Sequence, residues 1–479
     1  MKSKAISMTS GSLPKNIWIF SVPLIFSNIL QVLFNMSDVA VVGRFAGSHA
    51  LGSVGSCTIM VSLFTGLLIG MGNGVNAIIA RCEGARDYDR LSRSVHSALI
   101  VTTLYGLLVM VLGLAIAEPL LVLLKTKDEL LDGAVLYMRV YLLGTPALAI
   151  YNFGNGVLSA EGDSKRPLYY LATAGVVNIC LNLIFVIVFH LSVLGVALAS
   201  IISQYISSAL ILRRLFTCGE HYALSMKKMK ADGHVTRDLL MLGIPAGLQN
   251  AIFAVANLFI QSAVNSFDTV MVEGNSAAAN ADALVYDMMA GFYLACTTFM
   301  GQNYGAHKKD RVMKSYLICL SYAFVSAAVV GALLLLFGKQ FLSLFATDVL
   351  VIEAGMKRLR IMAFSYCVSA FMDSAIAASR GLGKTIVPTI VVILIVAAML
   401  KKFRDSRYVN NAFYGLRPAS TGLIGAACVA QFHTIFSLYS LYVCSWTITA
   451  ILETVYFLHI YHKLLGKDAN LEPEPAGGQ

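Results

Sequence analysis

Residues 17–44 read IWIFSVPLIFSNILQVLFNMSDVAVVGR, and this stretch decides the fold. Positions 16–37 carry no charge, and a helix of that length, at about 1.5 Å per residue, spans the hydrocarbon core of a bilayer. Asp38 follows, and the apolar residues after it continue the helix. The stretch therefore predicts a membrane-spanning helix with an acid near one end.

Asp38 has two interpretations. On a helical wheel Asn28, Asn35 and Asp38 fall within about 80° of one another, which predicts one polar stripe that faces other helices. An acid at membrane depth costs at least about 2.5 kcal/mol on insertion scales, which points to a function. Alternatively, Asp38 lies at the headgroup level as an ordinary helix-end acid.

The composition is that of a polytopic membrane protein. Of 479 residues, 57% are hydrophobic and only 13% are charged, and the mean hydropathy is +0.73. Soluble domains carry about 25% charged residues. The apolar runs allow about twelve crossings, with the long run 167–212 divided into two helices at 190–194. We therefore expect an all-α membrane protein.

The net charge of +10 is explained by membrane topology. If both termini are cytoplasmic, 23 of the 36 Lys and Arg residues fall in the inner segments, as the positive-inside rule requires. We therefore expect a multi-pass protein of the bacterial inner membrane with both termini in the cytoplasm and no nucleic-acid partner.

Nine cysteines are scattered singly without metal-ligand spacing.

The chain repeats itself at an offset of 221 or 222 residues. Three separate groups hold this offset: Pro23, Asn28, Asn35 and Phe45 with Pro245, Asn250, Asn257 and Phe267; Gly84 and Asp89 with Gly305 and Asp310; Gly162 and Pro167 with Gly383 and Pro388. Six crossings per half is an even number, so both halves enter the membrane in the same orientation. We predict two six-helix lobes related by a pseudo-two-fold axis along the membrane normal.

The repeat also predicts the domain boundaries. We expect a cytoplasmic N-terminus at 1–15, an N-lobe at 16–215, a cytoplasmic linker at 216–237, a C-lobe at 238–462 and a cytoplasmic tail at 463–479. Gly66, Gly70 and Gly74 recur every four residues and predict a small-residue packing face.

No enzyme motif is present. GLGKT at 381–385 lacks the first glycine of a phosphate loop, because position 378 is Ala378. No HExxH motif and no plausible hydrolytic triad occurs in the membrane segments. We therefore expect neither an enzyme nor a cofactor.

Polar residues at membrane depth are the candidate site. Asn178 and Asn182 share a helix face at i, i+4, Ser200 lies in the next helix, and Asp373 interrupts a later one. Carboxylate, amide and hydroxyl oxygens suit Na⁺, and a buried acid could instead carry a proton. Taken singly, each Asn or Ser is better explained by an interhelical hydrogen bond worth about 0.6 kcal/mol, whereas a function is favoured for Asp38 and Asp373.

One segment departs from the plan. Residues 395–431 read IVAAMLKKFRDSRYVNNAFYGLRPASTGLIGAACVAQ and place five basic residues where the crossing count requires an outer loop. The part KKFRDSRYVNNAFYGLRPASTGLIGAACV resembles a chromate transporter. We interpret it as a foreign segment within the C-lobe.

The rest of the chain resembles the multidrug and toxic compound extrusion (MATE) family, in its bacterial multidrug-exporter and DinF-like branch. The resemblance covers about 10–394 and 434–465 and rests on FNMSDVAVVGR, NICLNLIFVIVFH, GVALASIISQ, GNSAAANADALVY, QNYGAHKKDR and FMDSAIAASRGLGKT. It implies twelve helices in two lobes around a central cavity and cation-driven export of organic, often cationic, compounds.

Residue by residue, the resemblance makes Asp38 the acid of the N-lobe cation site, with Asn178 and Ser200 beside it. Asn182 stands where some members have a second aspartate, so Asp38 is the only carboxylate there and Na⁺ and H⁺ both remain open. Asp373 matches a C-lobe acid, but the glutamate that partners it in other members is missing.

We therefore predict a Na⁺- or H⁺-coupled antiporter with alternating access. Na⁺ at Asp38 is the one metal expected, and a monomer in the lipid bilayer with small cationic or amphiphilic organic substrates is expected. The candidates for lining the substrate cavity are Asn35, Met36, Tyr151, Gln249, Asn250 and Asn257. The alternatives are a lipid-linked saccharide flippase of the same superfamily, an inactive chimeric membrane protein, and a membrane scaffold or receptor.

Overall fold

The computed structural model describes residues 6–124, 126–264, 268–403 and 435–466; of 48, 255–264, 395–403, 435–445 and 466 it describes the backbone alone. Described residues of the first half form α1 (Leu13–Phe45), α2 (Gly47–Ala85), α3 (Tyr88–Leu123), α4 (Asp128–Leu142), α5 (Thr145–Ala160), α6 (Lys165–Leu183), a π-helical turn at Ile184–Val188 and α7 (Ser192–Thr217). Those of the second half form α8 (Gly233–Val264), α9 (Thr269–Gly305), α10 (Lys309–Leu342), α11 (Val349–Gly381), α12 (Ile386–Phe403) and α15 (Ile435–Gly466).

The helices account for the predicted twelve crossings. Within the described residues eight helices are long and apolar enough to span a bilayer, and α4 with α5, bent by 46°, makes a ninth. The helices α8, α12 and α15 complete the two sets of six. The break predicted at 190–194 is found at 189–191, between the π-helical turn and α7. His190 in this break and Ser192, the first residue of α7, adopt positive φ of 52° and 47°.

Aspartates start three of the helices. The side chains of Asp87, Asp268 and Asp348 accept hydrogen bonds from main-chain N–H groups in the first turns of α3, α9 and α11. A carboxylate at this position satisfies an N–H that has no partner within the helix and complements the helix dipole. Polar residues at these three positions thus mark where an apolar helix begins.

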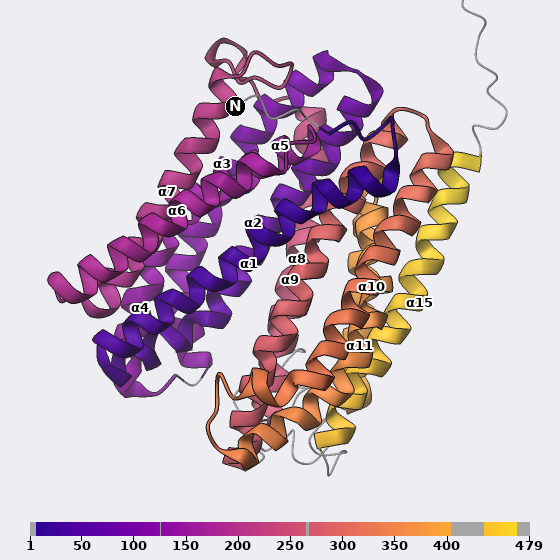
Figure 1. Cartoon of the computed structure of the whole chain (residues 1–479). Coiled ribbons are helices and arrows are strands. Elements are labelled where there is room, and N and C mark those ends of the chain that lie inside the picture. Colours follow the sequence, from indigo (N-terminus) through magenta and orange to yellow (C-terminus); the bar gives the residue numbers. More distant parts are fainter. Residues whose placement is uncertain (1–5, 125, 265–267, 404–434, 467–479) are drawn as a thin grey trace, which may run out of the picture.

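Two ends of the bundle are distinguished by the linker between α7 and α8. We call the end with this linker, where α1 also starts, the linker end, and the opposite end the far end. Figure 1 shows the two halves close together at the linker end and diverging toward the far end. Hydrogen bonds between the halves agree with this arrangement, since they lie from mid-depth to the linker end.

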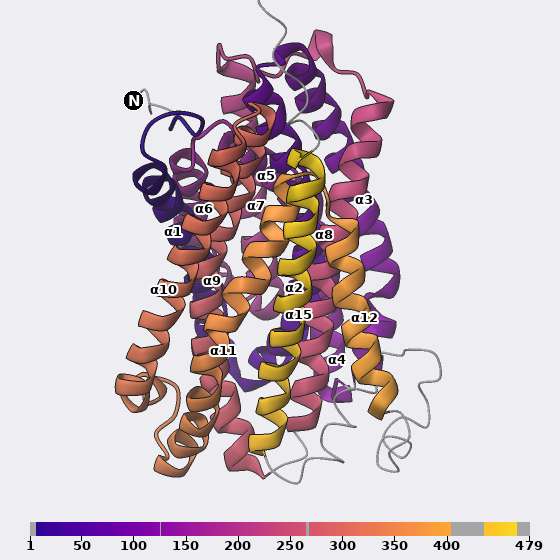
Figure 2. The same cartoon turned by 90° about the vertical axis from the view of Figure 1, so that its right-hand side faces the viewer.

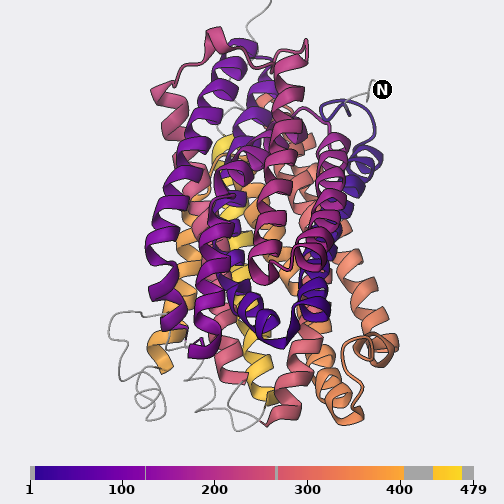
Figure 3. The same cartoon turned by 90° about the vertical axis from the view of Figure 1, so that its left-hand side faces the viewer.

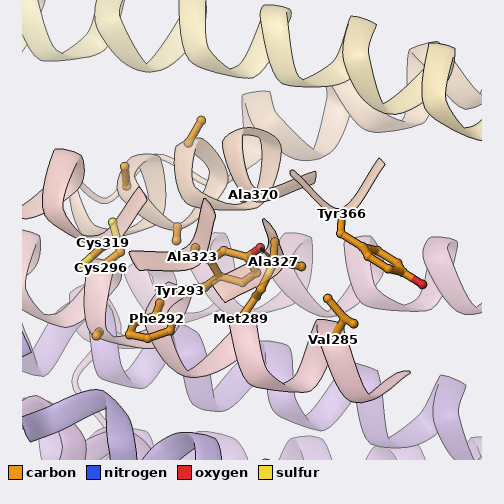
Figure 4. Packing of buried hydrophobic residues seen from close by; sticks show 14 of the residues in the cluster. Val285, Met289, Phe292, Tyr293, Cys296, Cys319, Ala323, Ala327, Tyr366 and Ala370 are labelled. Carbon is orange, nitrogen blue, oxygen red and sulfur yellow. Dashed lines mark hydrogen bonds between the residues drawn. The ribbon is translucent and has the colours of Figure 1, made fainter. Parts of the chain in front are cut away.

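The helices of each half pack side by side. Figure 3 shows those of the first half in front and those of the second half behind them. From the opposite side, Figure 2 shows α15 lying between α11 and α12. Figure 4 shows part of the C-terminal core, where Val285, Met289, Phe292 and Tyr293 of α9 face residues of α10 and α11.

The helix α1 belongs to both halves. Its linker-side residues Leu13, Ile17 and Phe20 are buried in a cluster with α9, α10 and α11. Its far-end residues Val41 and Val42 are buried in a cluster with α2 and α4. The helix therefore crosses from one half to the other, and Pro23 lies on the linker side of this crossing.

Its repeat counterpart α8 makes the reciprocal crossing. Leu239 and Leu242, at the linker side of α8, are buried among residues of α2, α3 and α5. The lobe boundaries 16–215 and 238–462 remain predictions, since packing assigns the first turns of α1 and α8 to the opposite half.

The predicted glycine face of α2 is a helix–helix contact. A Cβ built at Gly70 would lie 2.1 Å from the main-chain N of Gly247, and one at Gly74 would lie 2.9 Å from Gly243. Only glycine permits this distance between two backbones. The two halves are thus in direct backbone contact at the linker side.

Candidate functional site

A buried polar cluster joins α1, α6 and α7 near the far end. Asn182 Nδ2 donates a hydrogen bond of 2.5 Å to Asp38 Oδ1, and Ser200 Oγ donates one of 3.2 Å to Asp38 Oδ2. Asn182 Nδ2 also donates to Asn178 Oδ1 at 3.2 Å. All four side chains are at most 9% exposed. The structure therefore brings together the four residues that the sequence predicted for the N-lobe site.

Close packing of α1 on α6 aligns this cluster. Gly175 has no side chain, and a Cβ there would overlap the Phe34 ring at 1.8 Å. Asn178 and Asn182 follow Gly175 by three and seven residues, so they lie on the same face of α6. Asp38 follows Phe34 by one turn and consequently reaches them.

A π-helical turn begins two residues after Asn182, at Ile184. Such turns are rare and occur frequently at functional sites, because they re-aim the side chains beside them. The sequence analysis did not predict it, since no residue pattern there distinguishes it from an α-helix.

Two tyrosines missed by the sequence analysis lie within electrostatic range of Asp38. Tyr137 and Tyr141 are buried on α4, and their rings stack at 6.0 Å. Their i, i+4 spacing could have predicted two tyrosines on one face of this helix. They close the cluster with aromatic groups on the side of α4.

The oxygen atoms of this cluster determine which cation it can bind. It offers one carboxylate, two amide oxygens and a hydroxyl, and Asn182 Oδ1 is buried with no hydrogen-bond partner. Hard cations prefer oxygen ligands, so these residues fit Na⁺, whereas Asp38 alone would suffice for a proton. In the part of the chain that the structure describes, no three His, Cys, Asp or Glu residues gather as a metal site.

Asp373 is not part of this cluster. Asp38 lies seven residues from the far end of α1, about 10 Å, whereas Asp373 lies eight residues from the linker end of α11, about 12 Å. Asp373 is 9% exposed and interacts electrostatically with Arg380. The two predicted coupling acids therefore belong to different helices and different depths.

Two predicted cavity residues lie at or beside the contact between the halves. Asn250 Nδ2 donates to the Gly66 carbonyl of α2 at 3.1 Å. Gln249 is 2% exposed, and its Oε1 has no hydrogen-bond partner. Asn28, the repeat counterpart of Asn250, donates to the Asp287 carbonyl of α9 at 2.9 Å.

The other predicted cavity residues are dispersed. Asn35 and Met36 are exposed on α1, and Met36 is 43% exposed. Tyr151 is buried in the core shared by α2, α3 and α5, and its hydroxyl donates to the Pro167 carbonyl, so it packs inside the first half. The side chain of Asn257 and nearly all of segment 395–431 lie outside the described residues.

A second buried polar group ties α9 to α11. Arg358 forms an ion pair with Asp282, whose other carboxylate oxygen accepts a hydrogen bond from Tyr366. Arg358 also donates to Asn275 Oδ1. The sequence analysis missed this group, although an arginine within an apolar helix was the available signal.

The sequence pattern of the MatE family matches residues 23–184 and 245–400. That of the chromate transporter family matches residues 361–465, which is longer than the predicted foreign segment 395–431. The chain is 29% identical to the probable multidrug resistance protein YpnP of Bacillus subtilis over 76% of this chain and 81% of that protein.

Two further proteins are similar over most of the chain. The multidrug export protein MepA of Staphylococcus haemolyticus is 22% identical over 88% of this chain and 92% of its own. A solved structure of a MOP superfamily transporter from Pyrococcus furiosus has a TM-score of 0.83 at 23% identity and covers 97% of this chain and 99% of its own. This last similarity concerns the fold.

Proposed function

Because the chain belongs to the MatE family, we propose that it exports small organic compounds from a bacterial cell in exchange for Na⁺ or H⁺. The observation that carries this proposal is the Asp38 cluster. A single buried carboxylate is held by side chains of two other helices, so binding a cation there changes the contacts between α1, α6 and α7.

The course of α1 supports coupling between this site and the rest of the molecule. One end of α1 holds Asp38 in the first half, and the other end is buried in the core of the second half. A change at Asp38 is therefore transmitted along one helix to the contact between the halves. A cation that binds one arrangement of the halves more tightly than the other shifts their equilibrium.

Asp287 supports cationic substrates. It lies near the middle of α9, and Gly291, one turn later on that helix, packs against Ile25 of α1. This face of α9 is consequently turned toward α1. An acid at mid-depth between the halves offers a counter-charge for an organic cation.

Basic residues at the linker end support a cytoplasmic location for that end, so the described arrangement, closed at the linker end, is an outward-facing one. Both halves come from one chain, which supports a monomer as the working unit.

The flippase alternative requires basic groups that bind a pyrophosphate. Arg358, the buried arginine of α11, is already paired with Asp282.

The test is ethidium efflux from proteoliposomes with an imposed Na⁺ or H⁺ gradient. We expect efflux with one of the two gradients and loss of it in Asp38→Asn. Asp348→Asn is the matched control, because Asp348 is an exposed helix cap at the same end and Asn caps equally well.

Two results would contradict the proposal. Efflux that survives in Asp38→Asn would remove Asp38 from coupling. Absence of efflux from a well-folded wild-type chain under both gradients would favour the inactive-chimera alternative, with segment 395–431 as its cause.

A further inference from the structure

Among the described residues, Glu453 is the most deeply buried acid outside the Asp38 cluster. It lies on α15, thirteen residues from the linker end, which is about 20 Å. Its side chain is 0% exposed, and neither Oε1 nor Oε2 has a hydrogen-bond partner. A carboxylate without donors in an apolar surrounding is costly, so such a group is retained for a reason.

Packing of α15 on α11 places Glu453 beside Asp373. Ala450, three residues before Glu453, is buried in one cluster with Val392 of α12 and with Met372 and Ile376, which lie on either side of Asp373 on α11. Phe457, four residues after it, packs against Tyr316 of α10 with ring centroids 4.4 Å apart. Glu453 therefore lies on the buried stripe of α15, and its charge interacts with that of Asp373.

The surroundings contain few groups that could neutralise this pair. Asp373 interacts with Arg380 on α11 and with Tyr286 and Tyr293 on α9. Among the described side chains, further titratable groups nearby are Tyr456 on α15, Tyr316 on α10 with Cys296 on α9, and Asp287, which interacts with Tyr286. The described side chains of α12, 386–394, include no titratable group.

We infer that Asp373 and Glu453 form a proton-binding site in the second half, separate from the Asp38 cluster. If both carboxyl groups were ionised, the apolar setting would hold two negative charges against the single positive charge of Arg380, so the pair shares a proton. A hard metal cation needs several oxygen ligands besides two carboxyl groups, whereas a proton needs only the carboxyl oxygens themselves. Proton binding by this pair does not depend on the proposed function. A role of the pair in coupling transport rests on that function.

The test is labelling with dicyclohexylcarbodiimide, which attacks protonated carboxyl groups in apolar surroundings. The purified full-length chain in nanodiscs is labelled between about pH 5 and pH 9, and the adduct at each glutamate is measured by peptide mass spectrometry. We expect an adduct at Glu453 that falls about tenfold per pH unit once the pair loses its proton. The exposed Glu353 and Glu273 are internal controls.

Substitution of the partner tests whether the proton is shared. Asp373→Asn removes one of two repelling charges, so the labelling curve of Glu453 shifts to lower pH. Glu453→Gln keeps the shape of the side chain and loses the adduct, with an unchanged monodisperse gel-filtration peak as the folding control.

Two results overturn the inference. One is no adduct at Glu453 over the whole pH range in the folded chain, and the other is a labelling curve that Asp373→Asn leaves unchanged. Labelling needs no transport, so a chain that binds this proton but exports nothing would refute the proposed function and leave the site intact.

Discussion

At the scale of the residue, the amide of Asn182 is the group that most directly controls Asp38. One Nδ2 donates to both Asp38 and Asn178, while the Oδ1 of the same amide has no partner. An aspartate in this place would add a second negative charge. The asparagine instead supplies a donor to the carboxylate and an oxygen that a cation could use.

Removal of this amide should weaken the coupling ion. Asn182→Ala leaves Asp38 Oδ1 without its donor and removes one oxygen, at a cost of about 1–3 kcal/mol. We expect the cation concentration for half-maximal efflux to rise about 5- to 150-fold, which corresponds to this cost. Asn280→Ala is the control, since Asn280 is exposed and donates only to carbonyls of its own helix. Equal ion dependence in the two variants would exclude Asn182 from the site.

Ion pairs at two depths should differ in their contribution to stability. Asp282→Asn removes the negative charge that balances the guanidinium of Arg358, which is only 7% exposed. Breaking a buried ion pair costs about 3–5 kcal/mol. Glu118→Gln breaks the exposed pair with Arg139, worth about 0–1 kcal/mol. Thermal unfolding in detergent should show a large loss of stability only for Asp282→Asn. Similar melting temperatures would contradict this.

At the scale of the element, α2 and α8 form the contact that holds the halves together at the linker side. Gly66 lies against Asn250, Gly70 against Gly247 and Gly74 against Gly243. Three glycines at four-residue spacing allow backbone contact along two turns. The contact is therefore sensitive to any side chain placed on it.

A side chain at Gly70 should separate the halves. Gly70→Leu places a Cβ 2.1 Å from the Gly247 nitrogen, so α2 and α8 cannot close as described. We expect a longer distance by electron–electron resonance between spin labels at the exposed repeat counterparts Asp89 and Asp310, in a cysteine-free background. Gly55→Leu on the same helix meets nothing within 4 Å and should leave that distance unchanged.

At the scale of the whole molecule, the N-terminal segment connects the two halves across the linker end. The Ile6 amide donates to the Gly162 carbonyl between α5 and α6. Arg311, on α10, donates to the carbonyls of Met8, Ser10 and Gly11. The segment is thus anchored to both halves at once.

Loss of this anchor should loosen the linker end. Arg311→Ala removes three charge-assisted hydrogen bonds, each worth about 1.5–3 kcal/mol. We expect the spin-label distance distribution between Asp89 and Asp310 to broaden toward longer distances. Lys314→Ala, an exposed position one turn later, serves as the control. An unchanged distribution in Arg311→Ala would show that the glycine contact alone closes this end.

The apolar runs and the internal repeat predict the membrane crossings and the two halves, and the polar residues at membrane depth predict the candidates for the Asp38 cluster. Twenty apolar residues in a row can only span a bilayer as a helix, and i, i+4 spacing fixes which side chains share a face. Spacing placed Asn178 and Asn182 on one face, and the resemblance to the MATE family made them and Ser200 the expected partners of Asp38. Asp373 was also predictable as a buried acid, because charge within an apolar helix is visible in the sequence.

Neighbours across the lobes could not be predicted from the sequence, because they depend on how the helices pack. The crossing of α1 and α8, the burial of Tyr151 and the neighbourhood of Asp373 and Glu453 depend on which helix packs on which, and helical periodicity does not encode that. Glu453 carries its signal in the sequence as an acid within an apolar run. Its position near Asp373 follows from the cluster that Ala450 forms with the residues on either side of Asp373, which are almost eighty residues away in the chain.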